Sequence, residues 1–139
     1  MMKKLLLVLL CLPIIGFGQL TYVPDDIFEQ ELINLGYDNV LDDYVTTANI
    51  NTVDTLIINP PSTGAGWSTS DLTGIEDFTA LTYLDCSWNQ IANIDVSNNS
   101  ALTYLDCSFN HLTSLDVSNN TSLIQLNCKW NELTNLDVS

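Results

Sequence analysis

Three cysteines recur in the sequence with a period of 21 residues, at Cys86, Cys107 and Cys128. Thiolates bind zinc, but a zinc site needs ligands arranged as a tetrahedron, and a column of equivalent thiols does not supply one; the single histidine, His111, is not adjacent. Parallel neighbours would point their Cβ atoms the same way, and an odd number leaves one thiol unpaired. We therefore predict a buried column of free thiols that pack as small apolar side chains.

Acidic side chains follow the same period in two columns: Asp85, Asp106 and then Asn127 in one, and Asp95, Asp116 and Asp137 in the other. Like charges in register repel each other, and a bound calcium ion would relieve that repulsion. No calcium-loop pattern occurs, however, and the densest acidic stretch, YDNVLDDYV with Asp38, Asn39, Asp42 and Asp43, lacks the loop glycine. A solvated acidic face is the favoured interpretation, a structural calcium site is the alternative, and we predict no metal.

Aromatic residues occupy two further positions of the period. One column precedes an asparagine in each unit (Trp88, Phe109, Trp130), and the other lies three residues before each cysteine (Tyr83, Tyr104, then Gln125). Aromatic side chains are enriched at binding hot spots. The predicted binding face is Tyr83, Asp85, Trp88, Tyr104, Asp106, Phe109, Gln125, Lys129 and Trp130. The alternative is that the Trp88 column only stacks on itself and covers the core.

Catalysis finds no support in the sequence. There is one histidine, no phosphate-binding glycine loop and no Ser-His-Asp spacing. Stacked aspartates share one environment, whereas an acid/base pair needs two different ones. We predict that the chain is not an enzyme and has no catalytic residues and no cofactor.

The elements that position these residues follow from the repeat L-x-x-L-x-C-x-x-N-x-[L/I], present in three units that begin at Leu81, Leu102 and Leu123. Alternation predicts a short strand with Leu84 and Cys86 facing inward and Tyr83, Asp85 and Ser87 facing outward. The asparagines Asn89, Asn110 and Asn131 would form a ladder, because an amide offers a donor and an acceptor to the backbone of a neighbouring coil. This pattern resembles the leucine-rich repeat. The resemblance covers residues 81–139 and implies inward Leu, Leu and Cys and a turn asparagine.

The second half of each unit has a similar pattern, L-x-x-L-x-V-x-x-N, for example at Leu112, Leu115, Val117 and Asn120. Each coil is therefore predicted to have two half-turns without a helix between them. Upstream, Val53, Leu56 and Ile58 form a degenerate coil; a Pro- and Gly-rich loop with Trp67 interrupts it, and Leu72, Ile75 and Phe78 rejoin the frame. The predicted fold class is a leucine-rich repeat solenoid of the α/β type, with a parallel β-sheet, mostly strand and turn, and an N-terminal helical cap.

The cap is predicted from VPDDIFEQELINLG, with Pro24 in the first helical turn, Gly36 at the stop, and Phe28, Leu32 and Leu35 on one face. This region and the repeats look like secreted leucine-rich repeat proteins of the Bacteroidetes, flavobacteria especially, with 21-residue repeats. Such proteins often end in a sorting domain of the type IX secretion system. The chain ends at Ser139 within a coil, so we expect either a longer native product or an open last coil.

A charged start, an apolar run from Leu5 to Ile15 and small residues Gly16 and Gly18 predict a signal peptide. The apolar run is too short to span a bilayer. The predicted domains are the signal peptide 1–18, the cap 19–50 and the repeats 51–139, divided into a degenerate coil 51–80 and regular coils 81–100, 101–121 and 122–139.

The formal charge of −14 becomes more negative once Lys3 and Lys4 are removed, which argues against nucleic acid as a partner. We expect a secreted or cell-surface module that binds an unidentified protein, or alternatively a polysaccharide through Trp88, Phe109 and Trp130. A spacer without a ligand is the third possibility.

Overall fold

The computed structural model describes residues 18–58, 60 and 68–138. The predicted signal peptide and the loop residue Trp67 therefore lie outside the described residues, apart from Gly18. The elements run in the order β1 (Leu20–Tyr22), α1 (Asp26–Asn34), β2 (Tyr44–Thr46), α2 (Thr47–Ile50), β3 (Thr55–Ile57), the 3-10 turn η1 (Ile75–Asp77), β4 (Tyr83–Asp85), β5 (Tyr104–Asp106), β6 (Ser114–Asp116), β7 (Gln125–Asn127) and β8 (Asn135–Asp137).

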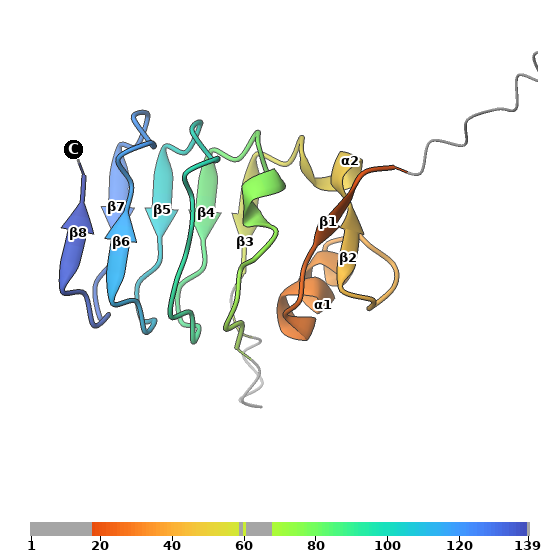
Figure 1. The fold of residues 1–139 in the computed structure, drawn as a ribbon, viewed down its shortest axis with the longest axis horizontal. Helices are drawn as coiled ribbons and strands as arrows, with labels where there is room; N and C mark the ends of the chain where they lie inside the picture. The colour runs from red at the N-terminus through yellow and green to blue at the C-terminus, as the bar shows by residue number, and fades with distance from the viewer. Residues whose placement is uncertain (1–17, 59, 61–67, 139) are drawn as a thin grey trace, which may run out of the picture.

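The principal sheet consists of four parallel strands in the order β3-β4-β5-β7. Leu56, Leu84, Leu105 and Leu126 are paired in register, so the same repeat position lines up across every strand. Figure 1 shows these strands side by side, with the coils following one another towards the C-terminus and the cap at the opposite end. A parallel sheet built from stacked coils confirms the predicted solenoid.

The other side of the solenoid carries a smaller parallel sheet, in which β6 pairs with β8. In the first regular coil the equivalent segment around Ile94 contains no strand. The described residues of the regular coils contain no helix, as predicted; the turn η1 belongs to the degenerate coil.

The core is a column of aliphatic side chains between the two sides. It contains the repeat leucines and six residues of the degenerate coil. These six are all buried: Val53, Leu56, Ile58, Leu72, Ile75 and Phe78. In the last coil Leu123, Leu126 and Leu133 are only partly buried. Stacking buries each coil against the next, so the burial of a coil depends on its neighbours.

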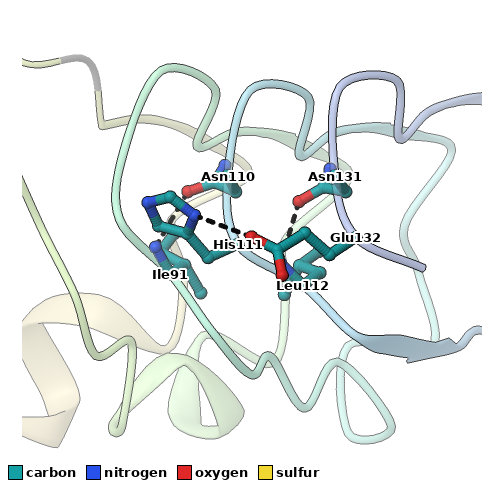
Figure 2. A network of polar contacts seen from close by, with 6 residues as sticks. All are labelled: Ile91, Asn110, His111, Leu112, Asn131 and Glu132. Atoms are coloured by element: carbon teal, nitrogen blue, oxygen red, sulfur yellow. Dashed lines mark hydrogen bonds and ion pairs between the residues drawn. The ribbon is translucent and has the colours of Figure 1, made fainter. Parts of the chain in front are cut away.

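The asparagine ladder joins the coils through side-chain amides. Asn110 Nδ2 donates to the Cys86 carbonyl at 2.9 Å, and its Oδ1 accepts the Ile91 N–H at 3.0 Å. Asn131 makes the same two bonds one coil later, to Cys107 and Leu112. Figure 2 shows these two amides with the backbone groups of Ile91 and Leu112 that they bind.

A second ladder on the opposite side was not among the predicted structural residues, although the repeat contains its positions. Asn99 Nδ2 donates to the Ile75 and Phe78 carbonyls at 2.9 and 3.0 Å. Asn120 Nδ2 donates to the Val96 and Asn99 carbonyls, each at 2.9 Å. The signal that could have identified it is the asparagine at the end of each second half-turn.

The N-terminal cap contains an antiparallel strand pair, β1 and β2, in addition to the predicted helix. Gly36 closes α1 as predicted: it has φ +83°, its N–H donates to Ile33 O, and the Tyr37 N–H donates to Leu32 O. This pattern is a Schellman C-cap, which requires a left-handed residue.

Two details of the cap prediction are wrong. Helix α1 begins at Asp26 with Asp25 as its N-cap, so Pro24 lies before the helix and not in its first turn. Asp25 takes that role because its Oδ1 accepts the Ile27 and Phe28 N–H groups. Leu35 is the C-cap residue and is exposed, since the helical face ends with Phe28 and Leu32 in the core.

Candidate binding face

The three aromatic residues that precede the ladder asparagines form one continuous stack. The ring centroids of Trp88 and Phe109 are 3.8 Å apart with planes 9° from parallel, and those of Phe109 and Trp130 are 5.6 Å apart at 16°. Trp88 is 59% exposed and Trp130 72% exposed, whereas Phe109 is half-buried between them. The column therefore does stack on itself, but its two tryptophans lie mostly in solvent.

All three stacked residues have left-handed backbone, with φ of 61° at Trp88, 55° at Phe109 and 56° at Trp130. Bulky L-residues rarely adopt this region. Bonds between coils hold the turn: the Trp88 N–H donates to Ser108 O at 3.0 Å and the Phe109 N–H to Lys129 O at 2.9 Å. The conformation projects each ring away from the strand in the same direction, which allows the rings to stack.

A second aromatic pair lies on the outer face of the principal sheet. The Tyr83 and Tyr104 ring centroids are 4.2 Å apart and the planes 2° from parallel, as expected from their paired positions on β4 and β5. The Tyr83 hydroxyl, together with partial burial and nearby negative charge, raises the pKa of Tyr104 to about 12. Gln125 on β7 continues this row and is exposed.

The first acidic column lies on the same strands, two residues after the tyrosines. Asp85 Oδ1 accepts the Ser87 N–H at 3.0 Å and the Ser87 hydroxyl at 2.7 Å. Asp106 and Ser108 repeat this arrangement at 2.9 and 2.6 Å. The sequence alternation placed Ser87 outward. That expectation is wrong: Ser87 and Ser108 lie beyond the ends of β4 and β5, where strand alternation no longer applies, and both are buried with their hydroxyls bonded to the preceding carboxylates.

The column ends in an amide. Asn127 Nδ2 donates to Asp106 Oδ2 at 2.8 Å and to the Ser108 hydroxyl at 3.3 Å. Lys129, the remaining predicted residue, is exposed beside Trp130 in the sequence, and its backbone carbonyl accepts a bond from Phe109. The predicted residues thus fall on the outer face of β4, β5 and β7 and on the turns that follow these strands. We call this set the binding face.

The cysteine column lies on the inward side of the same strands. Cys86 and Cys107 are buried, Cys128 is half-buried, and all three are free thiols. Burial, followed by the neighbouring Cys107 and the aspartates beside it, raises the pKa of Cys86 well above its ordinary value. Burial and the neighbouring Cys128 raise the pKa of Cys107 to about 12. Cys86 and Cys107 are therefore protonated at neutral pH and act as apolar packing groups.

Three acidic residues outside the binding face lie close enough together to hold a metal ion. Asp26, Glu29 and Asp43 have carboxylate oxygens within 4.8 Å of one another. Glu29 is buried, and its two oxygens accept the N–H groups of Asp42, Asp43 and Tyr44 at 3.0 to 3.1 Å. The carboxylate therefore closes the turn between α1 and β2, and backbone donors already satisfy it.

No family model and no curated protein matches the chain. Solved structures do. The functional domain of InlJ from Listeria monocytogenes, described as including a cysteine ladder, is 38% identical with a TM-score of 0.73; the alignment covers 87% of this chain and 26% of that one. An internalin (inlF) from Listeria monocytogenes is 23% identical with a TM-score of 0.68, covering 85% of this chain and 37% of that one.

The chain has the leucine-rich repeat fold. Both neighbours are bacterial leucine-rich repeat proteins, so the predicted fold class is confirmed. The leucine-rich repeat chain spans about a quarter of the InlJ structure and just over a third of the inlF structure. Among the helices that the structure describes, none has the length and hydropathy needed to cross a bilayer.

Proposed function

We propose that this leucine-rich repeat chain is an extracellular module that binds another protein through the binding face. The observation that carries the proposal is the column Trp88–Phe109–Trp130, in which two mostly exposed tryptophans are held in rare left-handed backbone. Strained residues persist where the surrounding structure over-determines them, and they cluster at functional sites. A rigid, exposed aromatic row loses little conformational entropy when a partner packs on it.

The stacking also favours a protein over a polysaccharide. A sugar ring needs the open face of an aromatic ring, but the faces between Trp88 and Phe109 are only 3.8 Å apart at their centroids and are occupied by each other. Ring edges and the flanking polar side chains instead form an extended surface suited to a protein partner.

The extracellular location is supported by the sequence of residues 1–18, whose charged start and short apolar run have the layout of a secretory leader. The high negative charge suits a protein that stays soluble outside the cell.

The test is photo-crosslinking on intact cells and on extracellular protein, with the chain from residue 19 as bait. The variant Trp88→Gly/Trp130→Gly removes both exposed indoles and keeps the left-handed turns. The matched control is Val40→Ser/Leu41→Ser, which removes two exposed apolar side chains from the cap. We expect the tryptophan variant to bind a captured partner at least about tenfold more weakly, because hot-spot aromatics dominate binding, and the control to bind normally.

Equal binding by both variants would overturn the proposal. Retention on insoluble polysaccharide that the tryptophan variant loses would favour the glycan alternative. A bait that captures no partner in either medium would favour a spacer.

A further inference from the structure

We propose that the sheet portion of the binding face, with Tyr83 and Tyr104 in one row and Asp85 and Asp106 in the next, receives a cationic polypeptide segment whose Lys or Arg side chains pair with the two aspartates. The inference rests on the proposed function, because it concerns the same face, and it adds the chemical class of the partner.

Hydrogen bonds fix the positions of the Asp85 and Asp106 carboxylates. They face each other in register on β4 and β5, where like charges are unfavourable. Each carboxylate is held by the N–H and hydroxyl of the serine two residues later through one oxygen, Oδ1. In the part of the chain that the structure describes, Asp85 Oδ2 accepts no hydrogen bond, and Asp106 Oδ2 accepts only from Asn127. The two carboxylates are therefore held side by side in fixed positions.

The chain itself provides no cation for this pair. Lys129 is the only Lys or Arg among residues 5–139. Within residues 18–58 and 68–138, neither Asp85 nor Asp106 forms an ion pair; the observed one joins His111 and Glu132 at 3.4 Å, just after the ladder asparagines Asn110 and Asn131 (Figure 2). A cationic side chain of a partner would therefore meet two carboxylates that no cation of the described chain occupies.

The surroundings of the pair suit a long cationic side chain better than a metal ion. Two aspartates offer few of the six to eight oxygen ligands that calcium takes. Ile57, paired with Asp85 across β3 and β4, is 47% exposed and adds an apolar neighbour in the same row. The tyrosine rings lie along the other side. Lys and Arg pack their aliphatic stems on such surfaces and place the charged end at a carboxylate.

The test uses a fluorescein-labelled oligo-arginine peptide and fluorescence anisotropy on the chain from residue 19. Asp85→Asn/Asp106→Asn removes two charges from the binding face, and Asp95→Asn/Asp116→Asn removes two from the opposite side, so the two variants have equal net charge. Asn127 already occupies the equivalent position in the last coil, where its Oδ1 accepts the Lys129 N–H at 3.4 Å, so asparagine suits this site. Urea unfolding of both variants checks that they fold.

We expect the first variant to bind the peptide about fivefold to tenfold more weakly than the wild type, as the loss of two partly exposed charge pairs implies. The second should change affinity by less than about twofold, because distant exposed charges are screened. Equal weakening in both variants, or no binding of the peptide by the wild type, would overturn the inference. Neither result would contradict the proposed function, because that proposal is tested separately, by the binding of the Trp88→Gly/Trp130→Gly variant.

Discussion

The rings of Trp88 and Phe109 lie 3.8 Å apart and 9° from parallel, although both residues have φ near +60°. One turn geometry therefore repeats from coil to coil with an aromatic side chain in a position that glycine or asparagine would occupy more readily. Stacking contributes about 0.5–1.5 kcal/mol per aromatic pair, which offsets much of the backbone cost of about 1–2 kcal/mol per residue.

Substitution of Phe109 tests this balance. Phe109→Gly and Phe109→Ala both remove the middle ring, but only alanine keeps the left-handed strain, so we expect the glycine variant to be more stable than the alanine variant by about 1 kcal/mol. Urea unfolding measures the difference. The control is Gln125 on β7, where Gln125→Gly should be less stable than Gln125→Ala. The same order at both positions would contradict the strain argument.

The ladder asparagines are expected to dominate stability among the polar residues. Asn110→Ala leaves the Ile91 N–H without its amide acceptor and removes one of the two amide donors to the Cys86 carbonyl, the other being Asn89. We expect a loss of about 2–4 kcal/mol in the free energy of unfolding. Asn119→Ala, at an exposed neighbour outside the ladder, should change it by less than about 0.5 kcal/mol. A small effect at Asn110 would mean that water replaces the amide.

Alkaline pH should destabilise the fold through its buried thiols. Burial first, and the neighbouring thiol and carboxylates second, raise the pKa of Cys86 and Cys107 above the ordinary value of 9.0. The unfolded chain therefore releases these protons first, and stability present below pH 9 falls as the pH rises towards the folded values. Stability measured between pH 8 and about 10 should decline less in Cys86→Ala/Cys107→Ala than in the wild type. Parallel curves would contradict this account.

Acid pH should act through Asp25. Burial alone would raise its pKa, but hydrogen bonds from the Ser70 and Phe28 backbone, the Ser70 hydroxyl and the Asp71 backbone together lower it below 3.8. The stabilisation is thus present above the unfolded pKa and is lost as the pH falls through the folded one. At neutral pH, Asp25→Ala should cost about 1–2 kcal/mol as an N-cap substitution, and the deficit should shrink in acid. Asp26→Ala, whose exposed residue is not the N-cap, serves as the control.

The periodic part of this structure could be predicted because each repeat position has one environment. Leucine, cysteine and asparagine recur at positions that strand pairing brings into register, so their spacing in the sequence identifies the inward side and the asparagine ladder. The aromatic and acidic rows follow from the same register. Both rows lie on one outer face because the tyrosines and aspartates are two residues apart, and side chains two apart on a strand point to the same face.

Other features depend on contacts that no local pattern carries. The antiparallel pairing of β1 with β2 joins segments separated by a helix and a loop. The left-handed φ of Trp88 has no sequence signal, because aromatic residues are not turn formers. Ser87 lies beyond the end of β4, so strand alternation does not set its direction, and Asp85 satisfies its buried hydroxyl. Leu35 is exposed because the helix stops at its position, so the apolar period extends past the element.

Every amide of the two asparagine ladders reaches back to residues nearer the N-terminus. Asn89 binds Ile58, Asn110 binds Cys86, Asn120 binds Val96 and Asn131 binds Cys107. The buried amide groups of a new coil therefore find their partners in chain that the ribosome has already made. The solenoid can therefore fold in one direction during synthesis, from the cap towards the C-terminus. Each finished coil then serves as the template for the next.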